Sequence, residues 1–373
     1  MPPQTVLTPN ILPQIRRRIL AWYEGNRRDL PWRRTRDPYA VWIAETMLQQ
    51  TRVKTAIPYY GRFLGAFPTL EALDRASKRK VLAVWSGLGY YRRAENLKRS
   101  ARRIVLEHGG TIPRDFDALR ALPGIGAYTA GAIMSIAFDR PYPALDGNAR
   151  RFLMRLLDIK QEKQLREAAT MLLPASRAGR FNQALMEIGS TICRARGPAC
   201  GLCPVSEWCA ARSAGRYDLG RLAMPKRRSR EVEWPLLVIR DGNRMLFRRR
   251  PEGGLLGGLW EIPGGERKRG ESVEAALARH LGGLAQGVGP RSYVGEIRHG
   301  ITYRRIRAPV FIRADYGERP SPDSSWRWLS LSNLDRYPLS SLSLKAVRLI
   351  EKHSHSVHGR ASSPARNNEG PSG

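Results

Sequence analysis

The sequence lacks any segment suited to anchoring in a membrane or to export. No run approaches the roughly 18 to 20 uninterrupted apolar residues that a membrane helix requires. The first residues also lack a basic stretch followed by an apolar run, which would mark a secretory signal. These absences predict a cytosolic protein with no membrane partner.

Acidic residues are scarce relative to basic ones. The 373 residues include 64 Lys and Arg but only 33 Asp and Glu, which gives a formal net charge of +31. Arginines recur in pairs and triplets along most of the chain, for example at residues 16–18, 92–93 and 248–250. A distributed basic surplus of this size makes a polyanion the first candidate partner, although a solvated charged surface would also account for it.

Cysteine is rare and confined to one stretch. The spacing is C-x6-C-x2-C-x5-C, formed by Cys193, Cys200, Cys203 and Cys209. Such clustering predicts a metal site and not a disulfide framework. Four thiolates suit either an iron–sulfur cubane or a tetrahedral zinc ion. Structural zinc sites usually pair two short C-x2-C knuckles, and because this stretch has only one, the spacing favours iron and sulfur.

The hydrophobic pattern changes along the chain. Three-and-four spacing between residue 11 and about residue 211 predicts helices, including 81–85, 92–107, 129–138, 150–157 and 182–192. After a basic stretch, short runs predict strands at 234–240, 245–249, 293–298, 303–313 and 326–330, with helices at 272–281 and 343–352. We therefore predict a mainly α domain at 9–212, a basic linker at 213–231, an α+β domain at 232–352 and a disordered tail at 353–373.

A glycine-rich turn joins two of the predicted helices. Gly124 and Gly126 lie in the segment Leu-Pro-Gly-Ile-Gly at 122–126. Glycine permits a tight turn whose N–H groups can point at a phosphate from a helix N-terminus. The turn therefore predicts a contact with the DNA backbone, although an ordinary helix connection has the same sequence.

Two carboxylates are candidates for catalysis. Asp37 and Pro38 begin a predicted helix that should continue through Gln50 and place Glu45 on a largely apolar stripe. Burial there would raise the pKa of Glu45, which suits a general acid, although a Glu paired to an arginine at the edge of the stripe is the alternative. Asp146 precedes another helix as its N-cap, where the helix dipole favours the ionised form.

Several segments together resemble the MutY family of adenine DNA glycosylases, in the endonuclease III superfamily. They are residues 42–51, 87–91, 122–130 and 145–148 and the cysteine loop, and the similarity covers about residues 11 to 212. The resemblance implies a helix-hairpin-helix glycosylase fold with a four-iron four-sulfur cluster on the four cysteines.

The same resemblance implies roles for individual residues. Glu45 would protonate adenine, Asp146 would stabilise the sugar cation, and the supporting polar groups would be Tyr128 and Asn148. Residues of the adenine pocket would be Trp32, Arg33 and Glu187. Residues that enter the base stack or contact the opposite base would be Gln50, Thr51, Leu88 and Tyr90. Bifunctional relatives have a lysine where this chain has Tyr128, so the amine needed for an imine is missing.

The C-terminal half resembles the Nudix-like domain of the same family through residues 257–265. A working Nudix hydrolase needs a Glu-rich helix that holds magnesium, but the expected positions carry His280, Gly283 and Leu284. This domain is therefore predicted to bind and not to hydrolyse. The family commonly has Phe-Ser-His in the loop that recognises 8-oxoguanine. This chain instead has Ile301, which could still act as a wedge, followed by the candidate lesion contacts Thr302 and Tyr303.

These observations predict a monofunctional glycosylase that removes adenine mispaired with 8-oxoguanine or guanine from double-stranded DNA during base excision repair. It would act as a monomer in the bacterial cytosol, associated with the nucleoid through DNA. Three alternatives are a thymine glycosylase acting on G·T mismatches, a non-catalytic lesion-binding protein and a nucleotide pyrophosphatase. The Nudix-like domain argues against the first, the presence of both carboxylates against the second, and the missing glutamates against the third.

Overall fold

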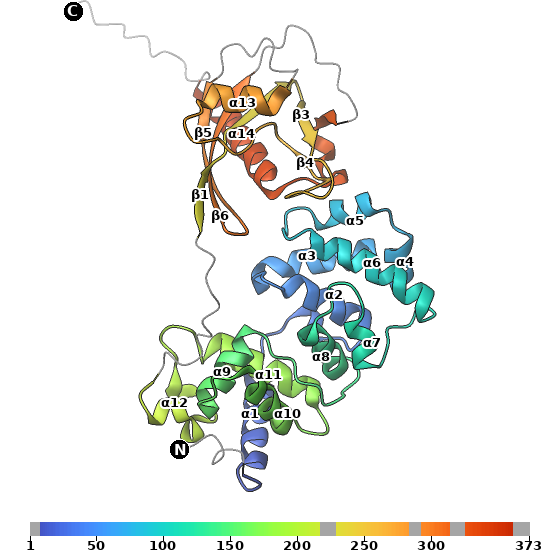
Figure 1. The fold of residues 1–373 in the computed structure, drawn as a ribbon, viewed down its shortest axis with the longest axis vertical. Coiled ribbons are helices and arrows are strands. Elements are labelled where there is room, and N and C mark those ends of the chain that lie inside the picture. The colour runs from blue at the N-terminus through green and yellow to red at the C-terminus, as the bar shows by residue number, and fades with distance from the viewer. Residues whose placement is uncertain (1–7, 217–228, 283–291, 314–324, 361–373) are drawn as a thin grey trace, which may run out of the picture. The chain divides into compact units, whose positions relative to one another are not determined.

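The computed structural model describes residues 8–216, 229–282, 292–313 and 325–360, and the chain divides into two compact units. The first unit contains residues 1–81 and 92–225, and the second contains residues 82–91 and 226–373. Figure 1 shows helices in the first unit and a sheet with helices in the second. Among the described residues, no helix is both long and apolar enough to cross a membrane.

The first unit is built from helices, as the sequence predicts. They are α1 (Leu12–Asn26), α2 (Pro38–Leu48), α3 (Val53–Ala66), α4 (Leu70–Arg75), α5 (Lys78–Trp85), α6 (Arg92–Glu107), α7 (Phe116–Arg120), α8 (Ala127–Ile136), α9 (Gly147–Leu157), α10 (Glu162–Leu172), α11 (Ala178–Thr191) and α12 (Ala210–Ser213). The C-terminal residues of α5 are grouped with the second unit. Short 3₁₀ turns lie at Pro31–Arg33, Cys200–Leu202 and Ser206–Trp208.

Helix α2 is central to this unit because it is buried along almost its whole length, from Tyr39 to Met47. It begins where the sequence predicts, since the Asp37 side chain accepts hydrogen bonds from the backbone N–H groups of Tyr39 and Ala40. It ends at Leu48, two residues before the predicted end. Gln50 has a φ of 59°, in the left-handed region, and an α-helix cannot continue through that conformation.

A second helical cluster surrounds α11, which packs against α1, α8 and α9. Two glycines allow α11 to approach its neighbours closely. A Cβ on Gly179 would lie 2.4 Å from the carbonyl oxygen of Ser135, and one on Gly189 would lie 2.4 Å from that of Asn148. Any larger residue at either position would push α11 away from α8 or α9.

The second unit contains a mixed seven-stranded sheet. Its strands are β1 (Arg230–Glu233), β2 (Leu236–Asp241), β3 (Arg244–Arg249), β4 (Trp260–Glu261), β5 (Ser292–Ile301), β6 (Arg304–Arg313) and β7 (Trp326–Ser330). The order is β1-β6-β2-β3-β4, with β5 beside β6 and β7 beside β3. Strand β2 runs parallel to β6 and antiparallel to β3. Sequence analysis missed β1 and β4, because the first is mostly charged and the second has two residues.

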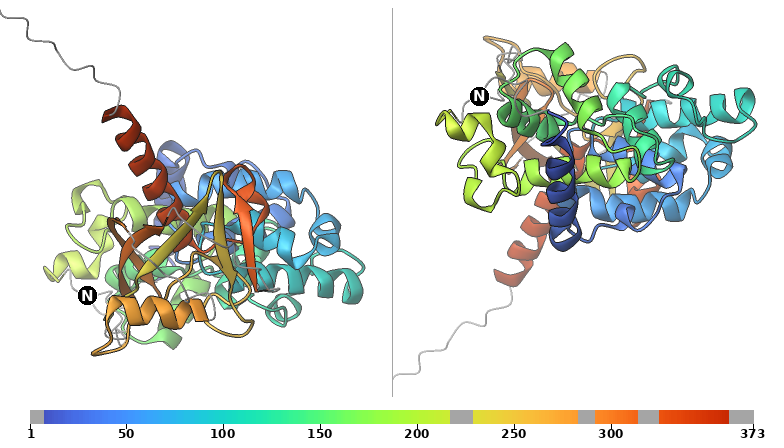
Figure 2. Two further views of the ribbon diagram at one scale, coloured as in Figure 1. Left: turned by 90° about the horizontal axis from the view of Figure 1, so that it is seen from above. Right: turned by 90° about the horizontal axis from the view of Figure 1, so that it is seen from below.

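Helices α13 (Val273–Leu281) and α14 (Ser341–Arg360) cover opposite faces of this sheet, as Figure 2 shows. Successive residues of a strand point to opposite faces. Accordingly, Leu236 and Val238 belong to the core formed with α14, whereas Leu237 and Ile239 pack with Leu277 of α13. The predicted combination of a helical domain and an α+β domain is confirmed.

Two predicted segments fall partly outside the described residues. The basic linker predicted at 213–231 includes residues 217–228, which the structure does not describe, and β1 begins within its last residues. The tail predicted at 353–373 overlaps α14, which continues to Arg360, and residues 361–373 are again outside the described part.

Candidate active site

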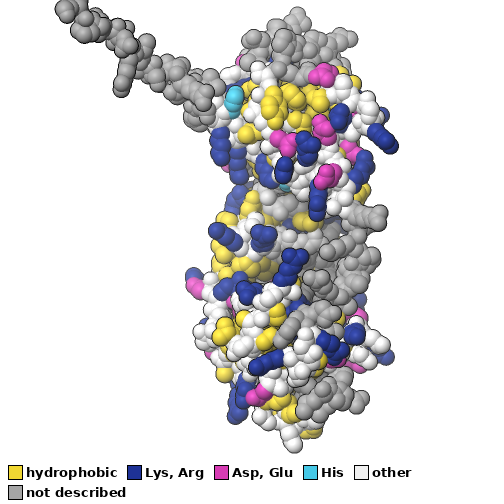
Figure 3. Space-filling view, turned by 90° about the vertical axis from the view of Figure 1, so that its left-hand side faces the viewer, with side chains coloured by type: hydrophobic (Ala, Val, Ile, Leu, Met, Phe, Trp, Pro, Cys, Tyr) yellow, Lys and Arg dark blue, Asp and Glu magenta, His cyan; other side chains and the backbone are white. Residues whose placement is uncertain are grey.

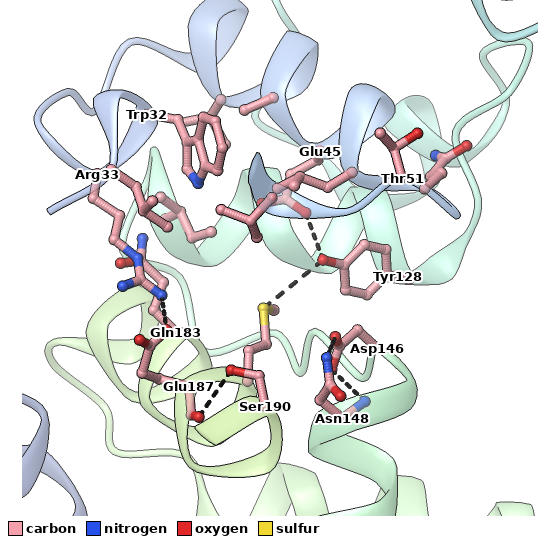
Figure 4. A pocket seen from close by; sticks show the side chains of 18 of the residues that line it. Trp32, Arg33, Glu45, Thr51, Tyr128, Asp146, Asn148, Gln183, Glu187 and Ser190 are labelled. Atoms are coloured by element: carbon pink, nitrogen blue, oxygen red, sulfur yellow. Dashed lines mark hydrogen bonds and ion pairs between the residues drawn. The ribbon is translucent and has the colours of Figure 1, made fainter. Parts of the chain in front are cut away.

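The first unit contains a cavity of about 560 Å³, a volume typical of small-ligand sites. Residues of α2, α8, α9 and α11 line it (Figure 4). The cavity brings together most of the site residues predicted from the sequence: Trp32, Arg33, Glu45, Gln50, Thr51, Tyr128, Asp146, Asn148 and Glu187. Sequence reasoning missed other lining residues, among them Arg28, Gln183 and Met186.

Glu45 is almost completely buried, with 4% of its surface exposed. The Tyr128 hydroxyl donates a hydrogen bond of 2.5 Å to Glu45 Oε2, and Figure 4 shows the two side chains pointing toward each other. Burial raises the pKa of Glu45 to about 7, although the Tyr128 hydrogen bond opposes this rise. The prediction of a raised pKa is confirmed, and Glu45 can carry a proton near neutral pH.

Asp146 is the N-cap of α9, as predicted. Its carboxylate accepts hydrogen bonds from the backbone N–H groups of Asn148 and Ala149 and from Asn148 Nδ2. These N-cap contacts favour the ionised form, as predicted, but they do not set the net direction of the pKa. Burial raises the pKa of Asp146 above its ordinary value, and the hydrogen bonds only oppose that rise. The N-cap effect is local, whereas the desolvation comes from the surrounding fold.

Asn148 also connects the cavity to the cysteine loop. Its side-chain oxygen accepts a 3.0 Å hydrogen bond from Arg151 Nη2, and Arg151 Nε donates at 2.9 Å to the carbonyl oxygen of Cys193. The orientation of the Asn148 amide is therefore fixed at both ends, by Asp146 and by Arg151. The role of Arg151 could not be read from the sequence, because its position in α9 has no motif of its own.

An ion-pair cluster around a buried carboxylate forms another side of the cavity. Glu187 is 0% exposed and receives hydrogen bonds from Arg28 Nε at 2.6 Å, Arg28 Nη2 at 2.9 Å and Arg33 Nη2 at 2.6 Å. Burial raises the pKa of Glu187, but the two arginines outweigh it and lower the pKa below its ordinary value. Glu187 is thus an anion held in place, and Trp32 adds an apolar surface to the same cavity.

Gln50 and Thr51 follow the C-terminal end of α2, where the chain turns away from the helix. Both line the cavity, and Gln49 Nε2 donates a 3.2 Å hydrogen bond to Thr129 Oγ1 of α8.

In the glycine-rich turn, Gly124 has a φ of 80° and Gly126 is the N-cap of α8. A Cβ on Gly124 would lie 2.8 Å from Asn96 Cβ, so both the backbone conformation and the close contact require glycine.

Four of the predicted site residues belong to the second unit and do not line this cavity. Leu88 and Tyr90 lie in residues 82–91, and Thr302 and Tyr303 form the turn between β5 and β6. Ile301 was expected to be available as a wedge, but it is only 9% exposed and belongs to the core of the unit. It shares one face of β5 with the buried Ile297, which explains the difference.

The four cysteines are free thiols that line one small pocket together with Phe152 and Ile192. Burial raises the pKa of Cys203 to about 11, and Arg155 Nη1 donates to Cys193 Sγ at 3.4 Å. In the described residues, no group of three or more His, Cys, Asp or Glu side chains is placed to hold a single metal ion.

The second unit has its own buried carboxylate, Glu261, in a cavity of about 320 Å³. Arg250 Nη1 donates to both of its oxygens, at 2.9 and 2.8 Å. His280, at a position where a Nudix hydrolase would have a glutamate, packs its ring against Gly265. Gly283 and Leu284, the other two such positions, lie outside the described residues.

Comparison with known proteins agrees with the two-unit architecture. Residues 43–175 match the HhH-GPD superfamily of base excision DNA repair proteins, and residues 236–349 match the NUDIX domain. The structure of a thermostable thymine-DNA glycosylase is similar to the helical part, with 31% identity and a TM-score of 0.52. That similarity covers 54% of this chain and 97% of the other.

Similarity to adenine DNA glycosylases extends over both units. The rat enzyme is 34% identical over 91% of this chain and 78% of its own length. The enzyme of Mycolicibacterium smegmatis is 40% identical over 60% of this chain and 79% of its own. The match to the rat enzyme covers most of both units, and the cavity holds the buried acid and the second carboxylate. The chain belongs to the adenine DNA glycosylases, enzymes that remove adenine from DNA in base excision repair.

Proposed function

We propose that this enzyme removes adenine mispaired with 8-oxoguanine or guanine, and that it does so without cutting the DNA strand. The observation that carries the proposal is Glu45, a buried carboxyl with a pKa of about 7 that contacts a neutral hydroxyl and lies in the same cavity as Asp146. A group with a pKa near the working pH is an efficient general acid.

The first step is extrusion of the base, since an adenine stacked in a duplex cannot reach a buried acid. Trp32, Arg33 and Glu187 would hold the extruded adenine, with Gln50 and Thr51 at the entrance. Glu45 then gives its proton to the base, which turns adenine into a better leaving group. Tyr128 orients the Glu45 carboxyl through its hydrogen bond.

Breaking the N-glycosidic bond leaves a developing positive charge on the sugar. Asp146, with Asn148 and two backbone N–H groups stabilising its anionic form, would face that charge and stabilise it. Water adds to the sugar and gives up one proton, which restores the protonated Glu45, and an abasic site and free adenine remain. In the described part of the chain no lysine lines the cavity, which supports a monofunctional reaction without an imine.

The four cysteines would hold a four-iron four-sulfur cluster. They line one pocket, and their spacing, with a single short C-x2-C pair, favours iron and sulfur over zinc. Cys200 begins the first of the two 3₁₀ turns, Cys203 follows it, and Cys209 follows the second. The remaining cysteine, Cys193, is contacted by Arg151 and Arg155. Bound there, the cluster would stabilise the loop and keep its basic residues available to DNA.

We further propose the division given by the sequence, with domains at 9–212 and 232–352, and a monomer that acts on duplex DNA in the bacterial cytosol. The second unit would read the base opposite adenine through Thr302 and Tyr303, which form an exposed turn. The pairing of Glu261 with Arg250 fits a domain that binds its ligand without hydrolysing it.

A thymine glycosylase is the second candidate, favoured by the structural similarity of the helical unit to a thymine-DNA glycosylase. Single-turnover cleavage of duplexes with adenine or thymine opposite guanine, 8-oxoguanine and cytosine separates the two. The adenine proposal requires release of adenine opposite guanine and 8-oxoguanine. Release of thymine opposite guanine, with no release of adenine, would overturn it.

A further inference from the structure

Arg93, near the start of α6, ends α2 by binding its last carbonyl groups. Its side chain is buried, and Nη1 donates hydrogen bonds to the carbonyl oxygens of Thr46, Met47 and Gln49 at 2.9, 2.8 and 2.5 Å. The last carbonyl groups of a helix have no partners within the helix and carry the negative end of its dipole. A single guanidinium therefore binds two of the last four carbonyl groups of the helix that carries Glu45, together with that of its C-cap residue.

The same guanidinium holds both sides of an unfavourable turn. Gln50 has a φ of 59°, a conformation that a non-glycine residue keeps only when surrounding contacts impose it. Arg93 binds the carbonyl of Gln49 on one side, and on the other its Nη2 donates to Thr51 Oγ1 at 3.2 Å. These bonds fix the backbone of Gln50 between two anchored neighbours.

Helix α6 supports the glycine-rich turn with the same face. Asn96 lies against Gly124, and Ser100 Oγ donates a 2.8 Å hydrogen bond to the carbonyl oxygen of Pro123. Arg93, Asn96 and Ser100 are three and four residues apart, so they lie along one side of the helix. Helix α6 thus fixes the positions of two turns relative to each other: the turn at Gln50 and the glycine-rich turn that is proposed to contact the DNA backbone.

We propose that Arg93 is a positioning residue for base extrusion, a role that rests on the proposed function. It holds Gln50 and Thr51 in the conformation in which they occupy the space that the adenine leaves in the stack. Arg93 does not line the cavity around Glu45 and Asp146. It therefore acts through the turn and not on the reacting atoms.

The test uses the full chain and a duplex with 2-aminopurine in place of the target adenine, because its fluorescence rises when the base leaves the stack. Arg93→Met should reduce the extrusion signal and the single-turnover release of adenine by about 10- to 100-fold, since small displacements of positioning groups cost this much. Arg93→Lys should fall between Met and the natural residue. Thr51→Val, which removes one acceptor, should reduce extrusion less than Arg93→Met.

Two further measurements separate positioning from damage to the fold. Arg99→Met removes an exposed arginine from the same helix and should leave extrusion unchanged. The pH dependence of adenine release should keep the same apparent pKa in all Arg93 variants, because Glu45 is not disturbed.

Normal extrusion in folded Arg93→Met would overturn the inference. If Arg93→Met does not fold, the Arg93→Lys and Thr51→Val variants provide the test. Normal base extrusion in both of them would also overturn the inference. The extrusion signal needs binding but no cleavage. An enzyme that extrudes the base and releases no adenine would therefore contradict the proposed function and leave the role of Arg93 supported.

Discussion

The two units of this chain each bury a carboxylate in a cavity, but the partners of those carboxylates differ. Glu45 contacts a neutral tyrosine hydroxyl, and its pKa is raised to about 7. Burial raises the pKa of Glu261 as well, and the two hydrogen bonds from the Arg250 guanidinium oppose that rise without cancelling it. Burial alone therefore does not make a general acid. The two carboxyls differ in their partners, since Glu45 contacts a neutral hydroxyl in a cavity shared with Asp146, whereas Glu261 is paired with a guanidinium.

Substitution of the two carboxylates by glutamine should separate catalysis from stability most strongly. Glu45→Gln keeps the shape but cannot deliver a proton, so adenine release should fall by about 10²- to 10⁴-fold or more. DNA binding should remain close to that of the natural enzyme. Glu261→Gln should instead leave the single-turnover rate intact and lower the melting temperature, because a buried arginine loses its charged partner.

Single-turnover rates and thermal melts of both variants provide the measurement. Near-natural adenine release in Glu45→Gln would exclude it as the acid. A large loss of rate in folded Glu261→Gln would show that the second unit takes part in the chemistry, and the contrast between the two cavities would then be incorrect.

The pH dependence should show the raised pKa of Glu45 directly. The reaction needs the protonated acid, so single-turnover release should fall by about tenfold for each pH unit above 7. Because the folded pKa exceeds the unfolded one, Glu45 contributes stability below its unfolded pKa, and this is lost as pH rises through about 7. Glu45→Gln should therefore gain thermal stability relative to the natural chain at pH 8 but not at pH 4.

Thermal melts of the natural chain and of Glu45→Gln at the two pH values test the stability part. An adenine-release rate that stays constant from pH 6 to pH 9 under single-turnover conditions would contradict the assignment of Glu45 as a proton donor with a pKa near 7.

Local signals made the central residues predictable. The cap at Asp37 and the apolar stripe placed Glu45 inside a buried helix, and the N-cap pattern placed Asp146 at the start of α9. The net effect on the pKa of Asp146 was missed because desolvation depends on elements far away in sequence. Arg28 was missed for the same reason, since its partner Glu187 is 159 residues away.

The second unit was less predictable at the level of individual side chains. The strands were recognised from their apolar runs, but the orientation of Ile301 was not. Its direction depends on the register of β5 with β6, in which Ile301 pairs with Arg304 beside a two-residue turn. In a hairpin the register is set by the turn and by the burial pattern of both strands together, which single residues do not reveal.

Loss of a cysteine should have a smaller and different effect from loss of Glu45. Cys200→Ser should lower the iron content from about four per chain, as a cubane requires, and weaken DNA binding before it changes the rate of the bound complex. The reason is that the loop, and not the catalytic cavity, contains the four thiols. Metal analysis, DNA titration and single-turnover rates at saturating enzyme provide the test. One zinc and no iron in the natural protein would exclude the cluster.

The smallest effect is expected at the turn between β5 and β6. Thr302 keeps a hydroxyl, but the Tyr303 phenol extends further than an imidazole, and Arg304 lies over its ring at 4.8 Å. Because a hydrogen bond to a neutral group contributes about 0.5 to 1.5 kcal/mol, the preference for 8-oxoguanine over guanine should be weaker by roughly 2- to 10-fold than with Ser-His at these positions.

The double substitution Thr302→Ser and Tyr303→His should therefore raise the ratio of adenine release opposite 8-oxoguanine to release opposite guanine. Ile301 must be left unchanged, because a phenylalanine there would overfill the core around Ile297 and Ile306 and confuse lost recognition with lost stability. Tyr303→Phe is the control for the case in which the Tyr303 phenol makes its own hydrogen bond to the lesion. In that case the single substitution Tyr303→Phe would lower the ratio of adenine release opposite 8-oxoguanine to release opposite guanine. An unchanged ratio in the double variant, with an unchanged melting temperature, would show that this turn does not read the opposite base.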